Sequence, residues 1–112
     1  MMPTPMLVAA DVVLFGKNAL GATSVLLIQR KNMPFQFSWA LPGGFVDADE
    51  DFEDAATREL AEETGIKLTD VKQVGIYGKP GRDPRGRVIS IAFTAKVSVE
   101  DFEPHAMDDA MN

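Results

Sequence analysis

The stretch that decides the fold covers residues 44–66 and reads GFVDADEDFEDAATRELAEETGI. Its residues 51–64 include neither glycine nor proline and are rich in alanine, glutamate and leucine, which favour helix formation. Gly65 follows directly, and glycine commonly ends a helix because it tolerates the left-handed backbone conformation. The sequence therefore predicts one helix of about four turns over residues 51–64, with Asp49 as its N-cap.

The C-terminal half of this predicted helix brings Glu59, Glu62 and Glu63 together. The apolar stripe of the helix comprises Phe52, Ala56 and Leu60, with Ala55 at its margin. At about 100° per residue the stripe continues to Glu59 and Glu63, with Glu62 at its flank. Carboxylates spaced by three or four residues are neighbours on a helix, and like charges at the edge of a core need a compensating cation. The pattern favours a cation site on the core-facing side.

The candidate ligands on this face are all oxygen atoms. The chain has no cysteine and one histidine, His105, which we expect at the surface of an acidic tail. Oxygen ligands without nitrogen or sulfur favour Mg²⁺, with Mn²⁺ as the alternative, over Zn²⁺. The competing interpretation is a solvated acidic helix face, because charged runs commonly face water. The overlap with the apolar stripe and the glycine loop at residues 42–44 count against it.

The same stretch resembles the Nudix box, G-x5-E-x7-R-E-U-x-E-E-x-G-U, in which U is aliphatic. Every fixed position is filled at the required spacing, by Gly44, Glu50, Arg58, Glu59, Leu60, Glu62, Glu63, Gly65 and Ile66. Residues 39–44, WALPGG, are also the usual approach to the box. The resemblance implies a Mg²⁺-dependent hydrolase that opens a phosphoanhydride bond, built as one domain over residues 1–112.

The resemblance also implies roles for the residues of the box. The metal ligands would be Glu59, Glu62, Glu63 and the carbonyl oxygen of Gly43. Glu59 would in addition orient or deprotonate the attacking water, and Arg58 and Glu50 would form an ion pair that holds the loop against the helix. The loop at Gly43 and Gly44 would let the substrate approach the backbone closely. A further acidic residue downstream is expected, with Glu100, Glu103, Asp108 and Asp109 as candidates.

A basic segment at residues 79–87 is the main candidate for phosphate binding. Its positive charges are Lys79, Arg82, Arg85 and Arg87, in an otherwise acidic protein. We predict that Arg85 or Arg87 contacts substrate phosphate, with a solvated turn as the alternative. Arg30, at the end of a predicted strand, is a further candidate. The sequence RDPRGRVIS resembles a segment of ADP-ribose pyrophosphatase-like Nudix proteins and of related ADP-ribose-sensing regulators, so ADP-ribose is the expected substrate.

Composition restricts the partners. The net charge is −6, from 11 basic and 17 acidic residues, which argues against a general nucleic-acid binder because such proteins neutralise phosphates. The lack of cysteine excludes disulfides and thiol catalysis and fits a cytoplasmic location. No apolar run approaches the ~20 residues of a membrane helix, and no signal peptide is expected. A homodimer that completes each site is compatible with the short chain.

The remaining pattern predicts an α/β fold with a mixed sheet and the helix on one face. Strands are expected over residues 7–15, 24–29, 69–77 and 87–97, with a hairpin between the first two, a loop at 79–86 and a short aromatic segment at 35–41. Phe35, Phe37 and Trp39 are assigned to the core rather than to base stacking. The resemblance implies an α/β/α sandwich, whose second helical layer needs more residues than the tail at 101–112 supplies. We therefore expect the C-terminal part to be short or missing.

The leading hypothesis is hydrolysis of ADP-ribose to AMP and ribose 5-phosphate. A nucleoside triphosphate pyrophosphohydrolase that sanitises the nucleotide pool is the alternative within enzymes. A non-catalytic ADP-ribose sensor is the alternative outside them, although such regulators carry a DNA-binding domain for which 112 residues leave no room. A domain with a relict box is the last alternative, and the complete Glu59, Glu62 and Glu63 set speaks against it.

Overall fold

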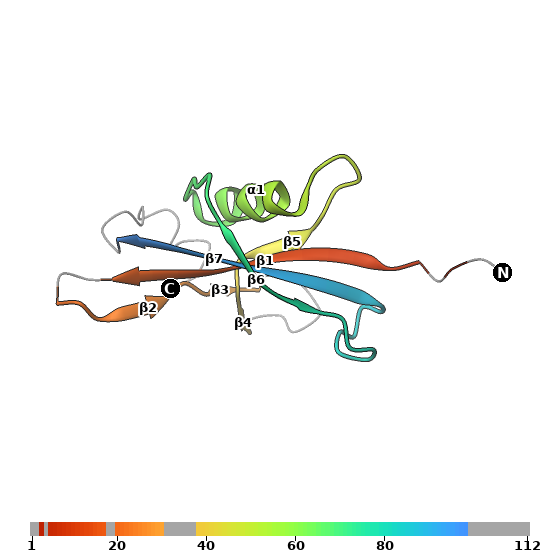
Figure 1. Cartoon of the computed structure of the whole chain (residues 1–112). Coiled ribbons are helices and arrows are strands. Elements are labelled where there is room, and N and C mark those ends of the chain that lie inside the picture. The colour runs from red at the N-terminus through yellow and green to blue at the C-terminus, as the bar shows by residue number, and fades with distance from the viewer. Residues whose placement is uncertain (1–2, 4, 18–19, 31–37, 99–112) are drawn as a thin grey trace.

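A computed structural model describes residues 3, 5–17, 20–30 and 38–98 of the chain. Its elements, in chain order, are β1 (Leu7–Lys17), β2 (Thr23–Val25), β3 (Ile28–Gln29), β4 (Trp39–Ala40), β5 (Gly43–Phe45), α1 (Phe52–Thr64), β6 (Lys72–Tyr77) and β7 (Val88–Ser98). Figure 1 shows α1 on one side of the long strands and β4 on the other.

Strands β1 and β7 form the centre of a mixed sheet. They pair in parallel over their whole length, from Leu7 opposite Val88 to Lys17 opposite Ser98. The strand order is β2-β1-β7-β6, and β5 pairs with the first half of β1. The pairs β1–β2, β1–β5 and β6–β7 are antiparallel. The predicted mixed sheet with the helix on one face is therefore confirmed.

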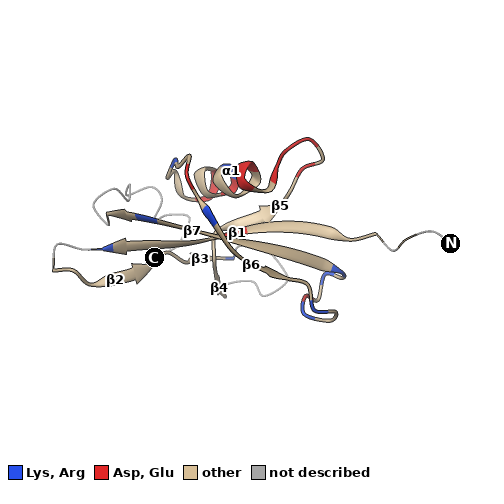
Figure 2. Ribbon diagram, viewed as in Figure 1, with Lys and Arg blue, Asp and Glu red and all other residues tan. Residues whose placement is uncertain are grey.

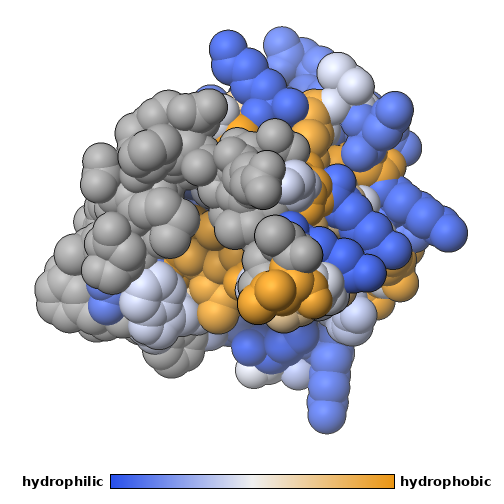
Figure 3. All heavy atoms as spheres, turned by 90° about the vertical axis from the view of Figure 1, so that its left-hand side faces the viewer, coloured by the Kyte–Doolittle hydropathy of each residue, from blue (hydrophilic) through white to orange (hydrophobic). Residues whose placement is uncertain are grey.

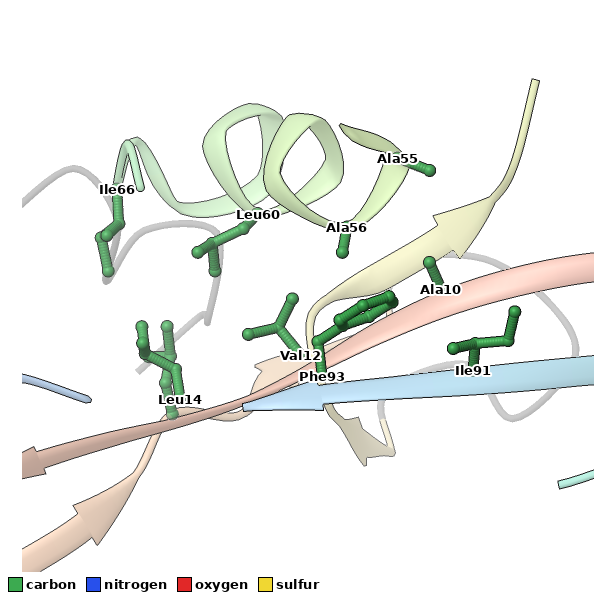
Figure 4. Close-up of a cluster of buried hydrophobic side chains, with 10 residues drawn as sticks. Ala10, Val12, Leu14, Ala55, Ala56, Leu60, Ile66, Ile91 and Phe93 are labelled. Carbon is green, nitrogen blue, oxygen red and sulfur yellow. The ribbon is translucent and has the colours of Figure 1, made fainter. Parts of the chain in front are cut away.

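The core fills the space between the sheet and α1, as Figure 4 shows. Alternate residues of the two central strands face the helix, because successive side chains of a strand point to opposite faces. The buried set comprises Ala10, Val12 and Leu14 of β1, Ile91 and Phe93 of β7, and Ala55, Ala56 and Leu60 of α1. Full burial of one such side chain as large as leucine or phenylalanine contributes about 1.5–3 kcal/mol, so these contacts fix where α1 lies.

The helix begins and ends at residues with capping geometry. Its N-cap is Asp51, not the predicted Asp49: Asp51 has an extended backbone and its carboxylate accepts a hydrogen bond of 2.7 Å from the amide of Phe52. Gly65 ends the helix with φ of 78°, as predicted. Phe52 is 41% exposed and does not join the core as expected, because the buried part of α1 starts one turn later, at Ala55.

Two other expectations differ from the structure. The segment 24–29 is not one strand: β2 pairs with β1, whereas β3 leaves the main sheet and pairs with β4. Trp39 lies in that small second sheet and is 51% exposed, so its assignment to the core is wrong. The predictions for Phe35, Phe37, His105, a second helical layer and the acidic candidates Glu100, Glu103, Asp108 and Asp109 lie outside the described residues.

The surface carries apolar side chains between charged ones. Figure 3 shows such apolar areas on the side of the molecule that lies at the left in Figure 1. Among the described residues, Leu20 is the most exposed large apolar one, at 93%. Across the described residues, no helix is long and apolar enough to cross a membrane.

Candidate active site

The acidic edge of α1, formed by Glu59, Glu62 and Glu63, lies against β5, and two glycines allow the close contact. The amide of Gly43 donates a hydrogen bond of 3.0 Å to the Glu63 carboxylate. At Gly44, a Cβ atom would lie 2.5 Å from the carboxyl carbon of Glu59, a distance that real side chains do not tolerate. Gly43 and Gly44 belong to β5, not to a loop as expected, and they let the strand backbone and the carboxylates approach because they carry no side chains.

Arg58 connects the loop before the helix with the acidic edge. Its guanidinium donates hydrogen bonds of 3.0 and 2.7 Å to the two carboxylate oxygens of Glu50, which confirms the expected ion pair. It also donates to Glu59 at 2.8 Å and to Glu62 at 3.3 Å. The bonds from Arg58, helped by the Asp47 amide, lower the pKa of Glu50 to about 2. The loop is thus fastened to the helix through one side chain.

Glu63 has a strongly raised pKa. Burial raises its pKa to about 8, and the neighbouring Glu59 carboxylate acts in the same direction. The hydrogen bond from the Gly43 amide opposes this rise without cancelling it. A buried carboxyl group beside a second carboxylate is destabilised in its charged form, and a nearby cation would relieve this.

The donor atoms at this edge fit a hard divalent cation, because they are carboxylate and carbonyl oxygens. Within the part of the chain that the structure describes, no group of three or more Asp, Glu, His or Cys side chains converges on one point as a metal site. Arg58 occupies oxygen atoms of two of the three glutamates, Glu59 and Glu62, through its hydrogen bonds. The Glu59 carboxylate lies beside Glu63 as well, so a cation bound here would compete with Arg58 for the oxygens of Glu59 and Glu62.

A cavity of about 560 Å³ adjoins the acidic edge, within the range of ligand pockets in proteins. Its charged and polar lining residues are Asp11, Gln29, Arg30, Glu62, Glu63, Arg82, Asp83, Arg85 and Ser90. Figure 2 shows acidic residues gathered along α1 and the loop before it, and basic residues along the loop between β6 and β7. The cavity therefore has an acidic side from the helix and a basic side from that loop.

Arg85 is held in a fixed orientation on the basic side. Its guanidinium donates to both carboxylate oxygens of Asp83, at 3.0 and 2.7 Å, and lies over the ring of Phe45 with 4.7 Å to the centroid. The bonds from Arg85 lower the pKa of Asp83 to about 2. Arg82, the second arginine of the loop, donates to the Val88 carbonyl at 3.1 Å and to the Ser90 hydroxyl at 3.0 Å.

The cavity unites most, but not all, of the site residues predicted from the sequence. The predicted residues that line it are Arg30, Gly43, Gly44, Glu62, Glu63 and Arg85. The lining does not include Glu50, Arg58 and Glu59, which are hydrogen-bonded to one another outside it. Arg87 is also absent from the lining, and its guanidinium donates at 2.6 Å to the carbonyl of Gly78. Arg85 is therefore the better placed of the two phosphate-binding candidates.

Two lining residues, Asp11 and Arg82, were not singled out as site residues from the sequence. The signal for Asp11 was available: it is the charged residue in the apolar run at 7–15, LVAADVVLF. A carboxylate within a central strand is costly to bury unless it is paired or hydrogen-bonded, so an isolated one marks a candidate site. No comparable signal separates Arg82 from its basic neighbours.

Comparison with known proteins identifies one family. The family model described as "NUDIX domain" matches residues 5–111. A curated relative, the ADP-ribose pyrophosphatase of Methanocaldococcus jannaschii, is 50% identical over 86 residues, which are 77% of this chain and 50% of that protein. The chain therefore spans about half the length of this relative.

Solved structures share the fold. The NUDIX domain of Shewanella oneidensis NrtR complexed with ADP ribose superposes with a TM-score of 0.78 at 38% identity, covering 85% of this chain and 62% of that one. The same NrtR has also been solved with a 27mer DNA. A bifunctional NMN adenylyltransferase/ADP ribose pyrophosphatase from Francisella tularensis, complexed with AMP and a Mn ion, gives a TM-score of 0.72 at 34% identity, covering 89% of this chain and 29% of that one.

Proposed function

This chain belongs to the NUDIX domain family, and on that premise we propose that it hydrolyses the diphosphate linkage of ADP-ribose to AMP and ribose 5-phosphate with Mg²⁺ as cofactor. The observation that carries the proposal is the cavity, where the acidic edge at Glu62 and Glu63 faces Arg82 and Arg85. The negative charge of a diphosphate needs positive charge around it. On one side of the cavity a cation held by the glutamates would supply that charge, and on the other side the arginines would. The names of the M. jannaschii and S. oneidensis proteins support ADP-ribose as the ligand.

Glu59, Glu62, Glu63 and the carbonyl oxygen of Gly43 would hold the cation, with Mn²⁺ as a substitute for Mg²⁺. When bound, the cation supplies positive charge to the diphosphate oxygens and promotes ionisation of water. The Mn ion bound in the F. tularensis complex supports this choice of cofactor. Asp11 and Glu63 share the cavity with the arginines, so the negative charge of the protein and that of the substrate would lie side by side without the cation.

The residues of the chain contribute position and charge. Arg85, fixed by Asp83, would bind one phosphate group, and Arg30 would reach the diphosphate from β3's end of the cavity. Glu59 would accept the proton of the attacking water. The water oxygen then bonds to phosphorus, the bridging P–O bond breaks, and the leaving phosphate departs as AMP or ribose 5-phosphate. Such reactions depend mainly on placement and electrostatics.

Turnover of ADP-ribose with Mg²⁺, followed by chromatography of AMP, tests the proposal. The Glu63→Gln variant should lose at least about 100-fold in kcat, since loss of a well-placed charged group commonly costs that much. The matched control is Glu53→Gln, an exposed glutamate in the first turn of the same helix. If wild type and Glu63→Gln release AMP equally slowly, the enzymatic proposal is wrong.

A sensor that binds ADP-ribose without turnover is the second candidate, and it is supported by the NrtR complex with ADP ribose. Binding of ADP-ribose without release of AMP would select it. Release of pyrophosphate from a nucleoside triphosphate, with ADP-ribose untouched, would instead select the nucleotide-sanitising enzyme.

NrtR also has a DNA complex, so the absence of a nucleic-acid partner for this acidic chain stays a prediction. The cytoplasmic location and the homodimer stay predictions as well.

A further inference from the structure

Asp11 lies in the middle of β1 and points into the cavity. It pairs with Gly43 in the β1–β5 ladder and with Ala92 in the β1–β7 ladder. Its neighbours Ala10 and Val12 are fully buried toward α1, so by the alternation of a strand Asp11 faces the opposite side, where it lines the cavity. A Cβ atom at Gly43 would collide with the Asp11 carboxylate and with the Ala10 carbonyl oxygen. The carboxylate therefore lies directly against the backbone of β5 at Gly43.

Asp11 lies between the two charged sides of the cavity. The positive charges of Arg82 and Arg85 act on it from one side, and it adds to the negative field at Glu63 on the other. Across the described residues, its carboxylate receives no hydrogen bond and forms no ion pair. The two nearby arginines, Arg82 and Arg85, donate to other partners instead. A half-buried carboxylate without a donor is unfavourable, and a ligand that supplies a donor relieves this.

The charges around Asp11 restrict what that donor can be. A phosphate is excluded because it would repel the carboxylate. A divalent cation is disfavoured because two arginines already act on this residue. What remains is a neutral hydrogen-bond donor on the substrate, of which a nucleotide has two kinds, ribose hydroxyl groups and the exocyclic amine of the base. Acidic side chains bind ribose hydroxyls in this way in other nucleotide sites.

We infer that Asp11 is a specificity-determining residue that accepts a hydrogen bond from a neutral donor of the nucleotide substrate while the arginines and the acidic edge hold its diphosphate. This inference rests on the proposed function. Beyond that function, the chain would select its substrate through a hydrogen bond from Asp11 in the cavity lining. A site built to bind a donor discriminates strongly against analogues that lack it, because its own polar group is then left unpaired.

The test combines variants of Asp11 with analogues of ADP-ribose. The variants are Asp11→Asn, which keeps the shape and removes the charge, and Asp11→Ala. The matched control is Asp70→Asn, which removes the same charge at an exposed position outside the cavity lining. The analogues are inosine diphosphate ribose, which lacks the exocyclic amine, and the two ADP-ribose derivatives that lack the 2-hydroxyl group of either ribose. Affinity is measured by calorimetry in chelator, and kcat and KM are measured with Mg²⁺.

The expected result is a loss of at least about tenfold in ADP-ribose affinity for both Asp11 variants, expressed mainly in KM, with the Mg²⁺ concentration for half-maximal rate unchanged. One analogue should already bind wild type that much more weakly, and Asp11→Ala should cause no additional loss with it. That analogue identifies the donor as amine or hydroxyl. Asp70→Asn should match wild type throughout.

The opposing outcomes are distinct. Equal losses with every analogue would show that Asp11 acts only through the structure, and a raised Mg²⁺ requirement would make it a metal ligand; either result overturns the inference. Binding of ADP-ribose with the expected coupling but no release of AMP would overturn the proposed hydrolysis and leave the role of Asp11 standing. If wild type binds none of the nucleotides in chelator and turns none of them over with Mg²⁺, both fall.

Discussion

Glu50 and Arg58 are joined by two parallel hydrogen bonds of 2.7 and 3.0 Å, between residues eight apart in the chain. Glu50 belongs to the loop that follows β5, and Arg58 to the second turn of α1. A bidentate pair of this kind fixes orientation as well as distance. The same guanidinium contacts Glu59 and Glu62, so the geometry of the acidic edge depends on this pair.

The Glu50–Arg58 pair predicts a loss of stability in acid. The folded pKa of Glu50 is about 2, below its ordinary value of 4.5. A lowered carboxyl pKa contributes stability above pH 4.5 that is lost as the pH falls toward 2. We expect Glu50→Gln to melt at a lower temperature than wild type at pH 6, with the difference shrinking toward pH 2. Thermal unfolding between pH 2 and 7 measures it, with Glu53→Gln as the control; a constant difference would contradict the pair's role.

Glu63 predicts the opposite behaviour when no metal is present. Its folded pKa is about 8, above 4.5, so the folded state binds the proton more tightly and loses stability as the pH rises from 4.5 to 8. Glu63→Gln should therefore be more stable than wild type in chelator at pH 8, by about 4 °C or more, since ~1 kcal/mol shifts the melting temperature of a domain of this size by about 4–8 °C. At pH 4 the two should coincide. A wild type more stable than the variant at pH 8 would refute the prediction.

Addition of Mg²⁺ should reverse that order. A ligand that binds only the folded state stabilises it by mass action, and the cation site is expected to need the charged Glu63. Titration of Mg²⁺ at pH 8 should raise the melting temperature of wild type and leave Glu63→Gln nearly unchanged. An equal rise of the melting temperature in both proteins would show that Glu63 is not part of the cation site.

Substitution by alanine should have different effects at the two glycines of β5, Gly43 and Gly44. At Gly44 the new Cβ would meet the end of the Glu59 side chain, which can move, so Gly44→Ala should fold with little loss of stability but lose about tenfold or more in kcat. At Gly43 it would meet the Ala10 carbonyl oxygen at 2.5 Å and the Asp11 Cα at 2.8 Å. Backbone atoms cannot yield as easily, so Gly43→Ala should lose about 1–3 kcal/mol of stability. Denaturant unfolding and turnover together distinguish the two, and similar effects at both positions would contradict the packing.

Substitution by lysine should affect substrate binding at Arg85 but not at Arg87. Lysine cannot replace a guanidinium that is held on two carboxylate oxygens and over an aromatic ring, so Arg85→Lys should raise KM for ADP-ribose by about tenfold. Arg87→Lys should leave KM unchanged and lower stability slightly, because its hydrogen bond to the Gly78 carbonyl lies outside the cavity lining. Steady-state kinetics of both variants provide the test. A larger KM effect at Arg87 would restore it as the phosphate ligand.

Local pattern was sufficient to predict the helix and its carboxylates. The 3.6-residue period, the end at Gly65 and the spacing of Glu59, Glu62 and Glu63 depend only on residues within a few turns of one another. The same reasoning failed at the N-cap, because Asp49 and Asp51 are chemically identical. The choice between them depends on the backbone angles of Asp51 and on its hydrogen bond to the amide of Phe52.

The cavity was decided by contacts between distant residues. Asp11 meets Gly43 through the ladder between β1 and β5, and the loop that carries Arg82 and Arg85 arrives through the pairing of β6 with β7. Strand pairing joins residues far apart in the chain, and no local period records which partners meet. The order of residues thus determined that a helix would present a row of carboxylates, whereas folding in three dimensions decided that an aspartate and two arginines would face them, because only sheet register brings those segments together.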